Sequence, residues 1–340
     1  MSEPHPHDLE AAPVPDRLPA ADLRALSVLE PGRALRAIAT EWSIIAAAIA
    51  LGLWAHHPLV TVLAVIVIGA RQHALLVIAH DAAHFRLLPG RVANDWVGNL
   101  LLSWPMFVSV QGFRHFHGPH HKFLAAPGDG NRALWSTHDG EGQLAPEWRY
   151  PKSTWGFVRK ILWRASGPTG AFWILRGVVG GFQFGVSPLG KLARLAFAGA
   201  VAALLTWAEA WGAFALYWVL PYCTWHVAAQ YIRLACEHSA IPSTAPGYEL
   251  TRTTLPTRLE GFFLLPRHVG YHIEHHWYPS VPFYRLPDLH ARLCQQAGFS
   301  AHAPISRSLR RSVRALLGPG FEASEAAQAS ASAATQGRTT

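Results

Sequence analysis

The chain has 340 residues, of which 50% are hydrophobic and only 15% are charged, whereas a soluble protein carries about a quarter charged residues. Its mean hydropathy is positive, at +0.14. This composition excludes disordered and collagen-like chains and most soluble enzymes. Three cysteines exclude a disulfide framework, a four-cysteine zinc site and a fully cysteine-ligated iron–sulfur cluster, while the twenty histidines are unusually many.

Three regions differ in composition along the chain. Residues 1–36 begin with a Pro-rich acidic stretch and lack a basic segment followed by an apolar run, so we expect an N-terminal cytoplasmic segment and no cleavable signal peptide. Residues 37–320 hold the apolar blocks and the histidines and are predicted to form one membrane domain. Residues 321–340, rich in Ala, Ser, Gln and Thr, are predicted to be a disordered low-complexity tail.

Two long apolar blocks predict the membrane helices. Residues 42–70 contain no charged residue, and residues 195–232 contain Glu209 alone. Each block is too long for one crossing, which needs about 20 residues, and each is broken near its middle, at His56-His57-Pro58 or at Glu209. We therefore predict an all-α integral membrane fold with four transmembrane helices in two hairpins, over residues 37–54, 59–79, 192–208 and 212–235.

The distribution of basic residues predicts the orientation. Neither hairpin tip carries a Lys or Arg, whereas residues 111–194 carry eleven of them against four acidic residues. The positive-inside rule then places both termini and the long middle segment in the cytoplasm, where they form a helical cap. The net charge of +8 is explained by this topology and by contact with anionic headgroups, so we expect no nucleic-acid partner.

Two further segments are expected to lie at the membrane without crossing it. Residues 96–113 are uncharged but interrupted by glycine, asparagine and proline, which predicts a half-buried or re-entrant segment. Residues 155–186 combine tryptophans with basic residues and predict helices on the interface. Arg71 and Glu209, near helix ends, are expected to snorkel toward water.

Eight histidines fall in three clusters with helical spacing. Spacings of three and four residues place side chains on one helix face, while the adjacent histidine of a pair points partly aside and can reach a second metal. Eight imidazoles are too many for one ion and suit two. All three clusters are predicted to lie on the cytoplasmic side of the membrane, so they can converge on one site. Any one cluster alone is as well explained by solvated surface histidines. The eight residues are His80, His84, His117, His120, His121, His272, His275 and His276.

The clusters and their surroundings resemble a known family. The order of the clusters, the stretch 270–287 (GYHIEHHWYPSVPFYRLP), and residues 71–75 and 235–238 are similar to the histidine-box membrane fatty acid desaturases, in particular a bacterial branch that includes rhizobitoxine-type desaturases. The resemblance implies a mushroom-shaped protein, expected in a bacterial inner membrane, and two iron ions held by the eight histidines and a ninth ligand, His238. Some relatives carry an asparagine four residues before that histidine; Leu234 stands here, and Glu237 is a possible substitute.

Several residues have both a functional and an ordinary interpretation. Asp81 and Glu274 are candidates to accept N–H bonds from ligand histidines, or are solvated cap charges. His73 lies seven residues before His80 on the same face, and a hydrogen-bonded helix histidine is the simpler reading. Three tryptophans are candidates for the walls of an acyl tunnel or are packing residues, and four other histidines are not expected to be ligands. These are Trp104, Trp135, Trp225, His56, His57, His115 and His226.

The site predicts a reaction that needs O2. Removing hydrogen from an unactivated methylene requires an oxidant that a redox-active metal pair with O2 supplies and zinc does not. We therefore predict desaturation of a membrane lipid or acyl substrate, with two electrons from a separate donor such as ferredoxin or its reductase. A hydroxylase or ketolase of the same superfamily is the nearest alternative. A membrane metal transporter is a remote one, because its sites would lie near the bilayer midplane.

Overall fold

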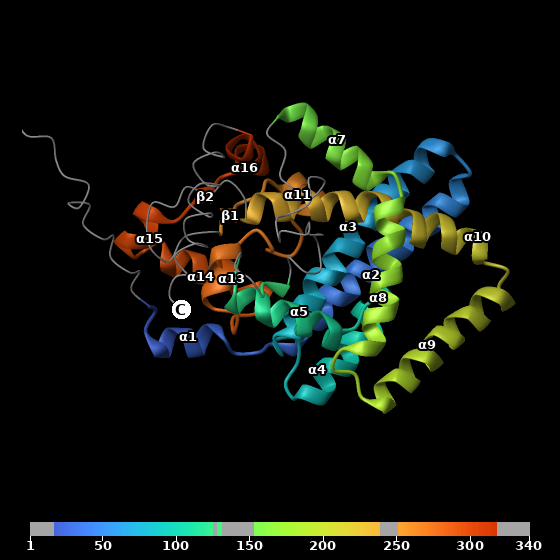
Figure 1. Ribbon diagram of the computed structural model, residues 1–340, viewed down its shortest axis with the longest axis horizontal. Helices are drawn as coiled ribbons and strands as arrows, with labels where there is room; N and C mark the ends of the chain where they lie inside the picture. Colours follow the sequence, from blue (N-terminus) through green and yellow to red (C-terminus); the bar gives the residue numbers. More distant parts are fainter. Residues whose placement is uncertain (1–16, 125–127, 131–152, 239–250, 318–340) are drawn as a thin grey trace, which may run out of the picture.

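Four long helices begin at a proline, and they frame the molecule. Proline suits the first helical turn because the N–H group it lacks has no partner there. The computed structural model describes residues 17–124, 128–130, 153–238 and 251–317 (Figure 1). The four helices are α2 (Pro31–Ala55), α3 (Pro58–Ala83), α8 (Pro168–Gln183) and α9 (Pro188–Trp207).

Both predicted hairpin breaks are turns in the structure. The first follows α2, where His56 adopts a left-handed backbone with φ of 47°. His57 then caps α3, since its Nδ1 accepts the N–H of Leu59. The second turn follows α9, where Glu209 has φ of 50°. A left-handed residue therefore reverses the chain at each tip.

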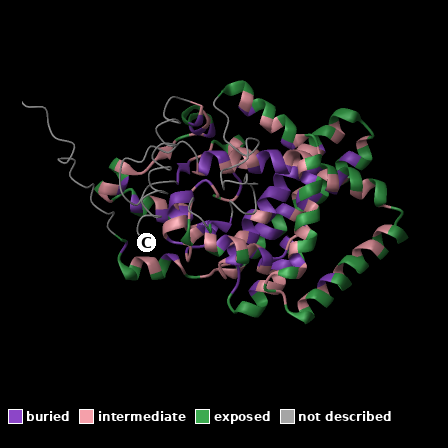
Figure 2. Cartoon of the chain, viewed as in Figure 1, coloured by how far each residue is buried: buried purple, intermediate pink, exposed green. Residues whose placement is uncertain are grey.

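Among the described residues, three helices are long and apolar enough to cross a membrane: α2, α3 and α9. They contain the first three predicted spans to within a residue or so, and α3 continues past residue 79 to include His80. Only 6% of the apolar window of α9 is buried, and Figure 2 shows this helix largely exposed. An apolar helix with so little protein contact is suited to a lipid environment.

The fourth predicted span is helical but not one regular helix. Residues 211–238 form successive α- and π-helical segments, and π turns inside helices are frequently found at functional sites. None of these segments alone has the length of a crossing. The segments are α10 (Trp211–Phe214), η3 (Ala215–Val219), η4 (Tyr222–His226) and α11 (Val227–His238).

Two glycines let other helices pack closely on this fourth helical run. A Cβ atom on Gly69 of α3 would lie 3.0 Å from the Pro221 carbonyl oxygen, and one on Gly170 of α8 would lie 2.3 Å from the Cα of Cys223. No side chain fits at either point. The fourth run is therefore held between α3 and α8, which places α11 beside the end of α3.

Arg71 does not snorkel, contrary to expectation. It is 5% exposed, and its Nη1 donates to Glu41 at 3.2 Å; Glu41 also accepts from Arg267 at 2.5 Å. Glu41 is fully buried, so two cations compensate one buried carboxylate. These ion pairs join α2 and α3 to the segment that precedes the third histidine cluster. Glu209, by contrast, is exposed at its hairpin tip.

The predicted re-entrant segment ends one helix and starts another. Residues 96–113 span the end of α4 (Arg91–Gly98), the π-helical η1 (Asn99–Ser103) and the first residues of α5 (Val110–Lys122). None of these elements is long enough to be a membrane span. The predicted interfacial segment forms α7 (Thr154–Ala165) and α8.

The C-terminal part consists of short helices and one small strand pair. The strands β1 (Thr253–Thr254) and β2 (Ile305–Ser306) pair in parallel, so within the described ranges the expected all-α fold holds apart from these two segments. The helices are α12 (Arg258–Phe263), α13 (His272–Trp277), η5 (Phe283–Arg285), α14 (Leu286–Leu293), α15 (Ala297–His302) and α16 (Leu309–Leu316), and near the N-terminus α1 (Ala20–Leu26). Residues 1–16, Trp135 and the predicted tail 321–340 lie outside the described residues.

Candidate metal centre

Four helices bring the histidines together. The first cluster ends α3, the second lies on α5, His238 is the last residue of α11, and the third cluster forms most of α13. These helices meet near the middle of the molecule (Figure 1). Ser109 fixes the start of α5, because its hydroxyl accepts the N–H of Gly112.

Arg114 connects the first two clusters. From α5 it donates to the carbonyl oxygens of Ala83, at 2.8 Å, and Ala82, at 3.0 Å, at the end of α3. The same guanidinium is paired with Asp95 of α4 at 2.6 Å. A cation at unpaired C-terminal carbonyls is stabilising, so Arg114 holds the His80 end of α3 beside α5.

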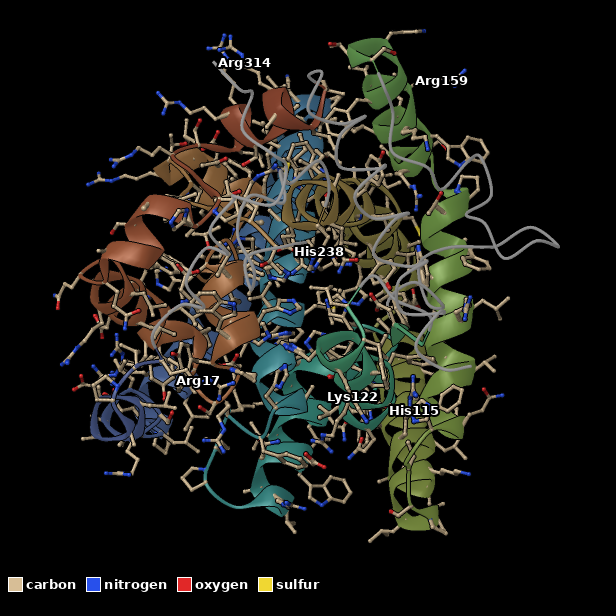
Figure 3. The ribbon with its side chains drawn as sticks, turned by 60° about the vertical axis from the view of Figure 1, so that its left-hand side comes forward. Arg17, His115, Lys122, Arg159, His238 and Arg314 are labelled. Atoms are coloured by element: carbon tan, nitrogen blue, oxygen red, sulfur yellow. The ribbon has the colours of Figure 1, made fainter. Side chains whose placement is uncertain are left out.

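All nine predicted ligand histidines lie in two groups, and within each group the candidate ligand atoms are within 4.8 Å of one another. Figure 3 shows His238 in the interior, among other side-chain nitrogens. Adjacent histidines divide between the groups, as a rotation of about 100° per residue predicts. The first group is His80, His84, His117, His121 and His275; the second is His120, His238, His272 and His276.

The distances between ring nitrogens fit shared metal ions. The Nε2 atom of His117 lies 2.7 Å from that of His80 and 2.9 Å from that of His121. In the second group, the Nε2 atoms of His272 and His238 are 2.7 Å apart. Two nitrogens bonded at right angles to one ion, each at about 2.1 Å, lie about 3 Å apart. The chain's geometry thus suits one ion in each group.

The protonation state of these histidines also suits metal binding. Burial, followed by the neighbouring imidazoles, lowers the pKa of His117, His272 and His276 well below its usual value. Burial lowers the pKa of His121 to about 3. These imidazoles are therefore neutral at pH 7, the form that coordinates metals. Among the described residues, several ring nitrogens here are buried without a hydrogen-bond partner, namely His84 Nε2, His120 Nε2 and His276 Nε2.

Carboxylates lie behind the histidines. Asp129 is 2.9 Å from Nδ1 of His120. Glu237 is 3.7 Å from Nδ1 of His272, and Asp81 is 3.9 Å from Nδ1 of His80. Of these three contacts, that of Asp129 is a hydrogen bond, and a carboxylate bonded to the far ring nitrogen fixes the tautomer and orientation of a ligand histidine. Asp81 instead accepts the N–H of Phe283, and the two oxygens of Glu237 have no hydrogen-bond partner among the described residues. Glu237 is in neither group of candidate metal-ligand atoms, and its substitution for the missing asparagine stays a prediction.

Glu274 has different partners from those expected. It accepts hydrogen bonds from Thr253 and from Nδ1 of His290, each at 2.5 Å, and not from a histidine of either group. The sequence analysis did not predict the contact of Asp129 with His120 or the pairing of Glu274 with His290. No local spacing identifies them, because each partner comes from another element or loop.

The other histidines and the tryptophans in the described part of the chain lie outside the two groups. His115 stacks on Phe184 with ring centroids 4.6 Å apart, while His56 and His57 form a hairpin turn. Trp104 and Trp225 do not line the cavity described below; Trp173 of α8 does. His73 and His226 are buried together on that cavity instead of binding in a group.

A cavity leads from the helices to the histidines. One wall is mostly apolar and includes Leu76, Val108 and Phe113, and the cavity reaches His80, His117 and His272. A carbon chain in this cavity would lie against the candidate ligand atoms while its other side remained in an apolar environment.

The described part of the chain has three apolar helices of membrane length. It also has two histidine groups that suit metal ions. These are the features of a membrane-bound metalloenzyme. The chain belongs to the fatty acid desaturase family, whose model matches residues 54–307. It is also 29% identical over 304 residues to the dihydrorhizobitoxine desaturase of Bradyrhizobium elkanii, an alignment that covers 82% of this chain and 80% of the relative. The resemblance predicted from the histidine clusters is confirmed, and the family indicates an oxidoreductase with a desaturase-type function.

Proposed function

We propose that the protein is an O2-dependent desaturase that introduces a C=C bond into an acyl chain, with two iron ions bound by the nine histidines. The observation that carries this proposal is the division of those histidines into two compact groups next to a cavity. Family membership supports the reaction class. The name of the relative identifies a desaturase acting on dihydrorhizobitoxine, so the substrate here is an acyl chain or a comparable carbon chain.

A metal pair with O2 supplies the oxidant that removal of hydrogen from an unactivated methylene requires. The chain's own residues supply the rest. The neutral imidazoles present lone pairs at two centres, and Asp129 orients the ring of His120 through a hydrogen bond to its Nδ1. Phe113 and its apolar neighbours exclude water from the part of the cavity next to His80.

Electrons and topology complete the proposal. We infer a separate electron donor, such as ferredoxin or its reductase, that delivers two electrons at the cytoplasmic side. The fourth helical run, 211–238, is proposed as the fourth crossing. The histidine groups then lie at the cytoplasmic membrane surface of a multi-pass protein, in a bacterial inner membrane.

Expression in a host that lacks the product, followed by mass spectrometry of lipids and soluble metabolites, tests this function. We expect a product two hydrogens lighter in the wild type and none in His120→Ala. His115→Ala is the matched control, because His115 is stacked on Phe184 outside both groups. A product one oxygen heavier would instead establish the hydroxylase alternative. Metal analysis of the purified protein should give two irons per chain; exchangeable zinc without O2 consumption would support a transporter.

A further inference from the structure

The fourth helical run presents a polar stripe to the cavity. His226, Gln230, Arg233 and Glu237 follow one another at intervals of four, three and four residues, and all four line the cavity. This spacing places them on one helix face. Polar residues on one face of a largely apolar helix are expensive in a membrane and mark functional sites by default. Glu237 lies next to His272 and belongs to the proposed metal centre; the other three have no role there.

His73 of α3 completes this group from the opposite wall. His73 and His226 are each 1% exposed, with ring centroids 5.9 Å apart. Among the described residues, neither nitrogen of His73 has a hydrogen-bond partner, and Nδ1 of His226 has none. A buried polar group without a partner is destabilising. Both rings border the cavity, so a bound molecule can satisfy them.

Arg233 supplies the positive charge. Its one ion pair among the described residues is a long contact of 3.5 Å between Nε and Glu237, which leaves the two terminal nitrogens of the guanidinium available. The other charged groups on the cavity are engaged or lie at its edge. Asp81 accepts the N–H of Phe283, Arg267 is paired with Glu41, and Arg176 is exposed.

We propose that His73, His226, Gln230 and Arg233 form a binding subsite for a free carboxylate of the substrate. The fork of N–H groups on arginine matches a carboxylate, and the neutral polar side chains around it offer further hydrogen bonds. Along α3, His73 is seven residues from His80, which corresponds to roughly 10 Å. The substrate class is then an amphiphile with a free acid group within roughly 10 Å of the reacting carbons, and not a chain esterified in a lipid. This proposal rests on the proposed function for the reacting end of the cavity.

Binding of octanoate and of octanamide, its neutral isostere, tests the subsite. Thermal unfolding of the full chain in detergent, with each compound titrated, gives the two dissociation constants without any turnover. We expect wild type to bind octanoate about tenfold or more tightly than octanamide, since hydrogen bonds to a charged group contribute about 1.5–3 kcal/mol. Arg233→Gln should abolish the preference, and Arg233→Lys should retain part of it.

Arg159→Gln is the matched control, because Arg159 projects from the outside of α7 (Figure 3) and does not line the cavity; it should retain the full preference. Equal binding of the two compounds by wild type would overturn the subsite, even if Arg233→Gln does not fold. A preference that persists in a folded Arg233→Gln protein would overturn it as well. Iron content and product formation of the wild type are measured separately. The absence of either would overturn the proposed function, whereas the binding assay alone decides the carboxylate preference.

Discussion

Asp129 and His120 lie 2.9 Å apart, carboxylate to Nδ1, and both side chains are almost fully buried. His120 thereby directs its other nitrogen, Nε2, toward the second histidine group. The second cluster serves both groups, because its neighbour His121 turns to the first. Correct placement of His120 is therefore a condition for two separate ions.

Asp129→Asn should weaken metal binding in the second group. The amide offers no charge to stabilise the Nδ1 proton, and loss of such a partner typically costs 10–100-fold in metal affinity. Titration of metal-free protein with Fe(II), followed by metal analysis, should show one site weakened and the other unchanged. Asp288→Asn, at an exposed ion pair with Arg285, should leave both sites as in wild type. Equal weakening of both sites would refute a role specific to His120.

Group-selective variants should separate the two ions. His84 belongs to the first group and His276 to the second. We expect His84→Ala and His276→Ala each to reduce the iron content toward one per chain, because each leaves the other group complete. His290→Ala, which removes a partner of Glu274 but no group member, should keep two. If either group variant lost all its metal while remaining folded, the two groups would have to be one site.

Glu41→Gln should be strongly destabilising. It leaves Arg71 and Arg267 with no counter-charge at a fully buried position, and breaking a buried ion pair costs about 3–5 kcal/mol. Thermal unfolding in detergent should show the midpoint falling by several degrees. Glu30→Gln is the comparison, since Glu30 pairs with Arg285 near the surface and such pairs contribute about 1 kcal/mol or less. Equal midpoints for the two variants would contradict the buried-pair argument.

The metal-free protein should lose stability as the pH falls below about 6.5. Burial holds the pKa of His121 at about 3 and that of His117 and His275 well below its ordinary value, whereas in the unfolded chain these histidines titrate near 6.5. Below pH 6.5 the unfolded state binds protons that the folded state does not, so the stabilising contribution is complete above 6.5 and declines toward lower pH.

Each such histidine adds a slope of at most about 1.4 kcal/mol per pH unit. Unfolding midpoints between pH 7.5 and 5, measured after chelation, should fall steadily, and His121→Gln should reduce the slope. A flat profile for the wild type would show that these imidazoles are accessible to protons when folded.

Much of the site followed from sequence because its signals are local. Histidines four residues apart share a group, as their spacing predicted, and adjacent histidines divide between the groups, whereas those three residues apart also divide. The resemblance added His238, which stands alone in the sequence. The hairpin turns at His56 and Glu209 followed equally from breaks in apolar runs.

What the sequence did not predict depends on contacts between distant segments. Arg71 lies near a predicted helix end, where an arginine commonly snorkels. Only the fold shows that it pairs with Glu41, which is 30 residues earlier in the chain and also binds Arg267, 226 residues further on from Glu41. Asp129 and His290 lie closer to their partners in sequence, but they were missed because neither spacing corresponds to a helix face. The fourth predicted span was helical, yet the periodicity of its sequence did not predict the π-helical segments that contact α3 and α8.

α3 is one continuous helix that carries the buried cation Arg71 and, at its end, the first histidine cluster. The angular relation between them is consequently built into the number of residues that separate them. Inserting a single residue between Arg71 and His80 would turn one against the other by about 100° and lengthen the rod by about 1.5 Å. The helix could then keep either the Arg71–Glu41 ion pair or the position of His80 in its group, but not both. Residues 72–79 should therefore tolerate side-chain substitutions far better than an insertion or a deletion.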